Sequence, residues 1–250
     1  MPQRTITVIR QGYDDSDGFD TGVSDALLRR VGEGLAPETF RISVPGSVVA
    51  FGKQDRIAPG FDRATEIARR HGYAPVIRLP GGRAAVFHDE VISFSWTVPI
   101  TDPVRDIRKR FARVAELVVA TLRDFGIAAS VGEIPGEYCP GEFSVNYDGS
   151  IKLAGIGQRL TKRAAHVGGV LVVGGSERIR EVLVPLYGAL GIDLDPSTVG
   201  ALDDVIPRID TSTVADALVT TLRAAMPVTE STLDNETLSL ARSLAPTHTP

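Results

Sequence analysis

The pattern of apolar and polar positions divides the chain into strands and helices in mixed order. Short apolar or alternating runs predict strands at residues 5–10, 47–51, 76–78, 84–87, 91–98, 127–131, 143–147, 151–156 and 167–173. Apolar residues at steps of three or four predict helices at residues 24–31, 61–70, 103–125, 177–190 and 215–225. This mixture predicts an α/β (α+β) fold.

Two segments of the pattern carry polar residues that are candidates for chemistry. Residues 143–147 and 151–156 flank Asp-Gly-Ser at 148–150, which predicts a tight hairpin because Asp and Gly tolerate a positive φ. Lys152 therefore lies near the start of the return strand. Residues 132–141 are rich in Gly, Pro and Glu and predict a loop, which contains the single cysteine, Cys139.

Length and composition indicate one globular domain. The 250 residues are 43% hydrophobic and 23% charged, which is ordinary for a folded protein. An α/β domain of this length often has one core, although two tightly joined halves also fit. We expect a single domain over residues 1–228 and a polar C-terminal tail over residues 229–250 that frays at its end.

Charge, hydrophobicity and cysteine content indicate the compartment and the kinds of partner. No run approaches the roughly 18 apolar residues that cross a bilayer, and the start of the chain lacks the pattern of a secretory signal. One cysteine cannot form an intramolecular disulfide, which fits a reducing compartment. We therefore expect a soluble, cytoplasmic protein. The net charge of −4 predicts no nucleic-acid partner, and no membrane partner is expected.

The motif Arg-Leu-Pro-Gly-Gly-Arg at residues 78–83 is a candidate binding turn. Gly81 and Gly82 lack side chains, so a ligand can approach the backbone, and Arg78 and Arg83 can meet an anion or polarise a carbonyl. The structural alternative is a bulged turn with two surface arginines. The motif lacks the Gly-Lys-Ser/Thr ending of a Walker loop.

Cys139 can attack a carbonyl if a neighbouring cation or base deprotonates its thiol. Glu137 and Glu142 would raise the pKa of the thiol, so activation requires a group such as Lys152 or a histidine. The alternative is an inert, partly buried thiol, because free cysteine often behaves as a small apolar residue.

Lys152 is followed by Gly155 and Gly157, which leave space beside one face of the strand. A lysine in such a place can reach into a cleft, where desolvation lowers its pKa towards values that suit acid/base chemistry. The alternative is an edge-strand lysine that protects against aggregation. A basic cluster after this strand consists of Arg159, Lys162 and Arg163. It can face solvent or dock an acidic protein.

The four histidines are dispersed and match no metal motif, so we expect no metal site. His71 follows a helix, His248 lies in the predicted tail, and His166 begins an apolar strand, where a core-edge role is the simpler interpretation. His88 lies in the polar corner His-Asp-Glu at residues 88–90, between two predicted strands, and can face solvent or substrate.

Several ordered blocks together resemble the biotin/lipoate protein ligase and octanoyltransferase family. Residues 48–54 look like its early apolar strand and turn, and residues 78–89 like its Arg-x-x-Gly-Gly-x-Ala-Val-x-His-Asp block. Residues 151–159 resemble its Lys-x-Ala-Gly-x-x-Gln-Arg strand, with Lys152 on the family's essential lysine, and residues 167–173 its next strand. The resemblance covers roughly residues 45 to 175.

The resemblance implies a mixed, largely antiparallel sheet with surrounding helices, like class II aminoacyl-tRNA synthetases and biotin ligases. It makes residues 1–228 a catalytic domain, with Val86, Phe94 and Trp96 along the tunnel for the acyl chain. The residues expected to bind the acyl substrate are Arg78, Gly81, Gly82, Arg83, Val86, His88 and Gly155. This chain has one extra residue between the glycines and His88, and Ser-Phe-Ser-Trp at 93–96 replaces an Asn-containing segment.

Tyr-Cys-Pro-Gly at residues 138–141 looks most like the cysteine-dependent octanoyl-[H protein] amidotransferases. That likeness implies an octanoyl or lipoyl transferase with a thioester on Cys139, Lys152 as acid/base and no required cofactor. The partners it implies are lipoyl carrier domains, namely the glycine-cleavage H protein and 2-oxoacid dehydrogenase subunits. The expected lack of an appended second domain favours a transferase.

Two alternatives remain open from the sequence. In an ATP- and Mg²⁺-dependent lipoate protein ligase, Lys152 would hold the acyl adenylate and Cys139 would be a bystander. In a non-catalytic lipoyl-binding module, the acyl pocket would bind without turnover.

Overall fold

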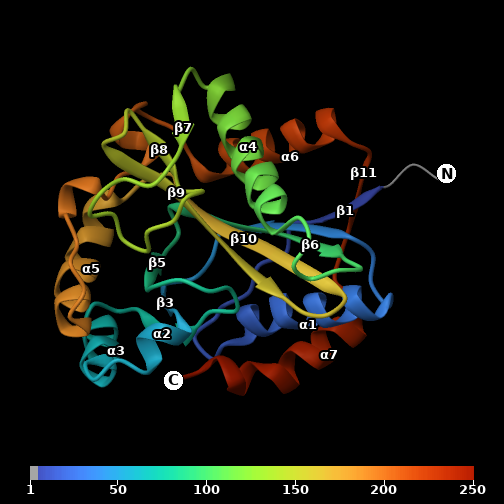
Figure 1. The fold of residues 1–250 in the computed structure, drawn as a ribbon, viewed down its shortest axis with the longest axis horizontal. Helices are drawn as coiled ribbons and strands as arrows, with labels where there is room; N and C mark the ends of the chain where they lie inside the picture. Colours follow the sequence, from blue (N-terminus) through green and yellow to red (C-terminus); the bar gives the residue numbers. More distant parts are fainter. Residues whose placement is uncertain (1–4) are drawn as a thin grey trace.

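Two β-sheets form the frame of the computed structural model, which describes residues 5–250 (Figure 1). In spatial order, the larger sheet consists of β11 (Val228–Ser231), β1 (Ile6–Ile9), β2 (Thr39–Ser43), β6 (Val91–Pro99), β10 (Ala164–Val172), β9 (Ile151–Leu160), β8 (Val145–Tyr147) and β7 (Ala129–Val131). The smaller sheet consists of β4 (Ala74–Ile77), β3 (Val48–Phe51) and β5 (Ala85–Phe87). Only β1 with its two neighbours and β3 with β4 pair in parallel among these described strands.

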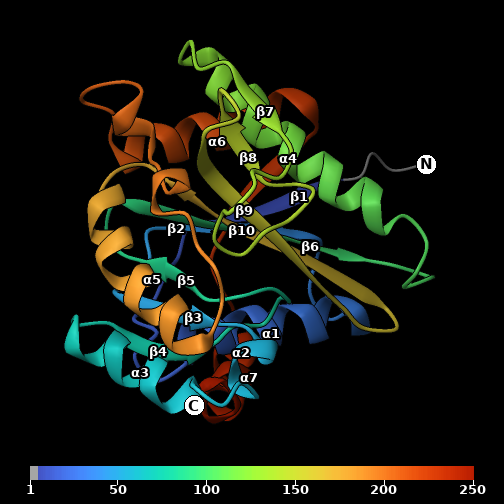
Figure 2. The same cartoon turned by 60° about the vertical axis from the view of Figure 1, so that its left-hand side comes forward.

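Helices cover both faces of the larger sheet and one side of the smaller sheet (Figures 1 and 2). The α-helices are α1 (Phe19–Glu33), α2 (Lys53–Arg56), α3 (Phe61–Arg70), α4 (Ile107–Asp124), α5 (Ser176–Leu190), α6 (Thr211–Ala225) and α7 (Asn235–Leu244). Short 3₁₀ turns lie at Pro196–Thr198, Leu202–Asp204 and Ala245–His248. In Figure 1, α4 and α6 lie on one face of the larger sheet, and α1 and α7 on the other.

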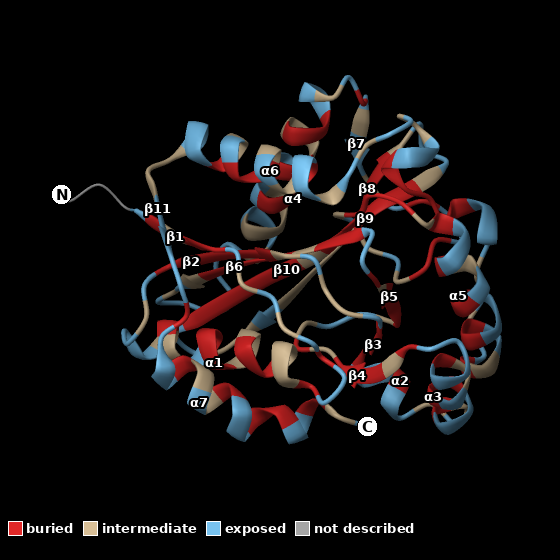
Figure 3. Ribbon diagram, turned by 180° about the vertical axis from the view of Figure 1, so that it is seen from behind, coloured by how far each residue is buried: buried red, intermediate tan, exposed pale blue. Residues whose placement is uncertain are grey.

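The core follows from the alternation of side chains along the strands. Phe40, Phe94 and Trp96 face α4 and α6, where they join the largest apolar cluster. A second cluster fills the space between the smaller sheet, α3 and α5 and includes Phe51, Val86 and Tyr187. Buried residues run along β6 and β10 and the inward sides of the helices (Figure 3). The predicted mixed, largely antiparallel sheet with surrounding helices is confirmed.

Some local predictions differ from the structure. The helix predicted at residues 24–31 is α1, which begins earlier because the polar residues before it are held by side-chain bonds: Asp15 Oδ1 accepts from Thr21 N at 2.9 Å. The strand β2 was not predicted, because buried Arg41 interrupts its apolar pattern.

Residues 229–250 do not form the expected polar tail. They contain the end of β11, which pairs with β1, and α7, which packs against α1 through Ala241 and Leu244. Leu233, just before α7, joins the same apolar cluster. His248 is buried, and its Nδ1 lies 2.9 Å from the carbonyl oxygen of Ile77. The few apolar residues of this segment share one face, which average polarity conceals. No helix among residues 5–250 is both long and apolar enough to span a membrane.

This docking predicts that Leu244→Ala lowers the free energy of unfolding by about 2–5 kcal/mol, because a buried leucine is replaced by a cavity. Urea denaturation measures the change. Leu35→Ala is the control, because Leu35 is 60% exposed, and it should have almost no effect. Equal stability of both variants and the wild type would show that α7 is not packed as described.

Candidate active site

A bulge in β9 turns Lys152 towards the loop that carries Cys139. Val145 of β8 pairs with Ala154, but the next residue, Asn146, pairs with Lys152, so β9 has one extra residue at Leu153. Such a bulge re-aims the side chains on either side of it. Lys152 and Gly155 consequently share a face: a Cβ on Gly155 would lie 3.3 Å from Cε of Lys152.

Lys152 is fully buried in an interior strand, which excludes the edge-strand interpretation. Its Nζ donates to Oε1 of Glu137 at 3.1 Å and to the carbonyl oxygens of Tyr138 and Cys139 at 2.8 and 2.9 Å. It also lies 4.8 Å from the centre of the Tyr138 ring. The lysine therefore contacts the backbone of the cysteine.

Glu137 organises the rest of the loop. Its carboxylate accepts from Ile134 N, Gly141 N and Ser144 Oγ, and the last of these bonds is 2.6 Å long. From the sequence, Glu137 was expected to raise the pKa of the Cys139 thiol. In the structure, this carboxylate instead forms a buried ion pair with Lys152.

The backbone of Cys139 has a φ of 44°, in the left-handed region that costs free energy for a residue with a Cβ. Cys139 N donates to the hydroxyl of Tyr187 at 2.8 Å, and that hydroxyl donates to the carbonyl oxygen of Ala84 at 2.9 Å. Together with the bond from Lys152, these contacts hold the cysteine in its unusual conformation.

Two donors from the glycine turn contact the thiol. Sγ of Cys139 lies 3.0 Å from Nη2 of Arg78 and 3.3 Å from the backbone N of Arg83. The turn approaches this closely because Gly82 has a φ of 108° and no side chain. A Cβ on Gly82 would lie 1.9 Å from Nη2 of Arg78 and 2.7 Å from Sγ.

Charge favours the thiolate of Cys139. Burial raises the pKa of this thiol, but the positive charges of Arg78 and Lys152 and the two hydrogen bonds outweigh burial, so the pKa lies below its ordinary value. Burial also lowers the pKa of Lys152, against the opposing charges of Cys139 and Glu137. The half-buried thiol is thus a better nucleophile than an isolated cysteine at neutral pH.

A pocket of about 110 Å³ extends from Cys139 across the larger sheet, between it, the smaller sheet and α1. Of the residues predicted to bind the acyl group, Arg78 and Gly155 line it. The predicted tunnel residue Phe94 borders it, but the Phe94 side chain lies in the apolar cluster with α4 and α6. Gly81 and Gly82 are exposed, and Gly82 lies beside the thiol. Arg83 contacts the thiol through its backbone and binds Asp55 through its side chain, with Nη1 and Oδ1 3.2 Å apart.

Two predicted tunnel residues lie elsewhere. Val86 faces the core between the smaller sheet and α5, while Ala85 and Phe87, its neighbours on β5, line the pocket. Side chains alternate along a strand, so a shift of one residue exchanges the faces. Trp96 faces the opposite side of the larger sheet, where its Nε1 donates to Oε1 of Glu38 at 2.8 Å.

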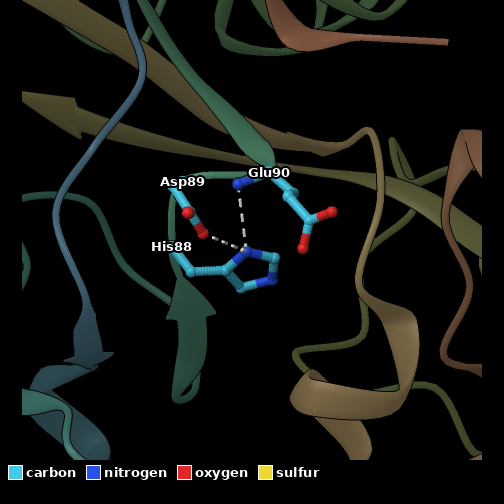
Figure 4. A group of neighbouring side chains, drawn as sticks. All are labelled: His88, Asp89 and Glu90. Atoms are coloured by element: carbon cyan, nitrogen blue, oxygen red, sulfur yellow. Dashed lines mark hydrogen bonds and ion pairs between the residues drawn. The ribbon is translucent and has the colours of Figure 1, made fainter.

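His88 is fully buried in the corner between β5 and β6, away from the pocket lining (Figure 4). Its Nδ1 accepts from Glu90 N at 3.1 Å, which leaves the proton on Nε2 in the neutral ring. His88, Asp89 and Glu90 lie close enough to hold a cation, but Arg178 binds both carboxylates and Nε2 lacks a free lone pair. The donor set therefore does not fit a metal.

The sequence did not predict three residues of the site: Tyr187, Arg41 and Asp20. Tyr187 lies on a predicted helix with no polar signal beyond its hydroxyl. Arg41 and Asp20 form a partly buried ion pair in the pocket wall, and an arginine within an apolar run was the available signal. His166, expected at the core edge, is buried, lines the pocket and has a pKa lowered to about 4, chiefly by burial.

This combination of a ligase-like sheet, a buried lysine and a glycine turn agrees with the comparisons. The family model of the lipoyl protein ligase A/B catalytic domain matches residues 19–223. This chain belongs to the lipoyl protein ligase A/B catalytic domain family.

Among relatives, the chain is 33% identical over 197 residues to an octanoyl-[GcvH]:protein N-octanoyltransferase of Geobacillus kaustophilus, covering 79% of this chain and 68% of the relative. It is 29% identical over 210 residues to a lipoyl-[GcvH]:protein N-lipoyltransferase of Listeria monocytogenes, covering 80% and 74%.

Solved structures share the fold. A lipoate-protein ligase A bound with ATP superposes with a TM-score of 0.77 at 19% identity, over 96% of this chain and 94% of the other. A bipartite lipoate protein ligase of Thermoplasma acidophilum gives a TM-score of 0.75 at 18% identity, over 96% and 92%.

The buried pair predicts that Lys152→Met lowers the free energy of unfolding by about 3–5 kcal/mol, because the carboxylate of Glu137 loses its counter-charge. Adding Glu137→Gln should recover part of the loss, which a double-mutant cycle by urea denaturation measures. Lys162→Met, at an exposed position, is the control and should be neutral. Additive effects of the two substitutions would contradict the pairing.

Proposed function

We propose that this protein is an acyltransferase that moves an octanoyl or lipoyl group between lysines of carrier proteins through a thioester on Cys139. The observation that carries the proposal is the thiol held between Arg78 Nη2 and Arg83 N at the start of the pocket. The names of the relatives support a carrier of the glycine-cleavage H protein type as donor. Lipoyl domains of 2-oxoacid dehydrogenase subunits are the proposed acceptors, and the cytoplasm, where a lone thiol stays reduced, is the proposed location.

In the first half-reaction, the thiolate of Cys139 attacks the carbonyl carbon of the acyl-lysine amide. A carbon–sulfur bond forms and the carbon–nitrogen bond breaks. The leaving amine of the donor lysine takes a proton from the ammonium of Lys152, whose lowered pKa suits this transfer. The acyl group remains on sulfur and the donor carrier leaves with a free lysine.

In the second half-reaction, the neutral amine of an acceptor lysine attacks the thioester carbonyl. The new amide bond forms, the carbon–sulfur bond breaks, and the surplus proton of the amine returns to Lys152. The thiolate is regenerated next to Arg78 and Arg83 N, which stabilise it as a leaving group. The amide bond of the donor supplies the free energy, so no ATP, metal or other cofactor is required.

Lys152 has a second role in this scheme, because it positions the nucleophile. Its Nζ donates hydrogen bonds to the carbonyl oxygens of Tyr138 and Cys139. The alternative ligase reaction, with ATP and Mg²⁺, would not use the thiol or the two donors that contact it. A lipoyl-binding module would likewise need no activated thiol.

The test is intact-protein mass spectrometry after mixing the protein with an octanoylated H protein in the absence of ATP. We expect the mass of one octanoyl group on the wild type and none on Cys139→Ser, which keeps the size of the side chain. Hydroxylamine should release the group, because thioesters are more labile than amides. An adduct that forms only with ATP and free octanoate would replace the transferase by a ligase, and binding without any adduct would favour a binding module.

A further inference from the structure

The floor of the pocket is made of small or polar residues that lie in register across four strands. Arg41 of β2 pairs with Ser95 of β6, which pairs with Gly168 of β10, which pairs with Gly157 of β9. All four residues line the pocket. The pocket runs across the strands along this row, beside two side chains that lie next to the glycines. A Cβ on Gly157 would lie 3.0 Å from Cβ of Pro80, and a Cβ on Gly168 would lie 2.9 Å from Nε2 of His166.

One end of this pocket is open and the other is closed. Gly82 is exposed and lies beside Sγ of Cys139, so a carrier lysine can arrive there. Arg41, at the other end of the row, is only 4% exposed. The acyl chain on Cys139 therefore extends from β9 towards β2 and α1.

The closed end is a fixed polar wall. Arg41 makes a two-pronged ion pair with Asp20 of α1, through Nη1 at 2.9 Å and through Nη2. Nε of Arg41 donates to the carbonyl oxygen of Gln11 at 2.9 Å, and Asp20 Oδ1 accepts from Tyr13 N at 2.8 Å. An apolar chain that displaced the pair would break these hydrogen bonds and offer no polar partners in their place. Displacement of the pair therefore costs free energy.

The distance across these strands is on the scale of a chain of eight carbons. Three strand spacings separate β9 from β2, which is about 14 Å. An extended eight-carbon chain is about 9 Å long, from the length of carbon–carbon bonds at tetrahedral angles. Contact between its last methyl group and the guanidinium adds about 4 Å.

We propose that the Arg41–Asp20 pair sets the length of the acyl chain that this enzyme accepts. The inference rests on the proposed transferase function and adds its substrate specificity. A chain of eight carbons ends at the pair, whether its end is a methyl group or the sulfur-bearing ring of a lipoyl group, which has the same eight carbons. Chains of ten or twelve carbons would have to displace the pair and are rejected.

The test compares kcat/KM for transfer from H proteins acylated with six-, eight-, ten- and twelve-carbon chains. In the wild type, the eight-carbon donor should exceed the twelve-carbon donor by about tenfold or more, since even single methylenes can discriminate at this level. In Arg41→Met/Asp20→Leu, which replaces the ion pair by apolar side chains, this ratio should approach one. The ratio is taken within one variant, so a change in the folded fraction does not alter it.

A second variant works in the opposite direction. Ser24 lines the pocket on α1, and its Oγ lies 3.5 Å from Nη1 of Arg41, so Ser24→Leu fills the pocket in front of the wall. It should shift the preference from eight to six carbons. The control is Arg70→Met/Glu66→Leu, which removes an exposed ion pair on α3 and should keep the wild-type ratios.

The possible results separate the two proposals. If no donor of any length acylates the wild type, the proposed function is overturned and this inference with it. If the wild type is acylated but uses eight and twelve carbons equally well, or if neither variant alters the ratios, the transferase stands and the role of Arg41 and Asp20 is overturned.

Discussion

The site depends on one buried ammonium group, that of Lys152. A buried charge is tolerated only when its hydrogen-bonding capacity is used, and here Glu137 and two carbonyl groups use it. The same three bonds hold the loop of residues 137–139 against β9. They therefore offset the cost of the left-handed backbone of Cys139, which faces its thiol towards the glycine turn.

Electrostatics and close packing then act on the same atom. The thiol accepts hydrogen bonds from the guanidinium of Arg78 and the N–H of Arg83, and the positive charge of Lys152 also lowers its pKa. The donors reach it only because Gly82 lacks a side chain, and Gly82 in turn packs on Gly52, where a Cβ would lie 1.6 Å from the carbonyl oxygen of Gly82. Small residues thus bring the guanidinium of Arg78 and the N–H of Arg83 into contact with one thiol.

The sequence was informative where local chemistry decides the structure. The hairpin at residues 148–150 placed Lys152 correctly at the start of β9, and the Gly-Gly motif marked the turn beside Cys139. Contacts between distant segments could not be predicted. The partnership of Glu137 with Lys152 depends on the bulge at Leu153, and the inward direction of Ala85 and Phe87 rather than Val86 depends on strand register. The packing of α7 depends on a few apolar residues within a polar segment.

The fold itself lowers the pKa of the Cys139 thiol below the ordinary value of a cysteine, through the positive charges of Arg78 and Lys152. The most direct test is the ultraviolet absorbance of the thiolate as a function of pH, taken as the difference between the wild type and Cys139→Ser. The structure predicts a titration midpoint below the value of about 8.5 that is usual for a free cysteine. A midpoint at or above that value would mean that burial outweighs Arg78 and Lys152, and that the thiol is not activated by this arrangement.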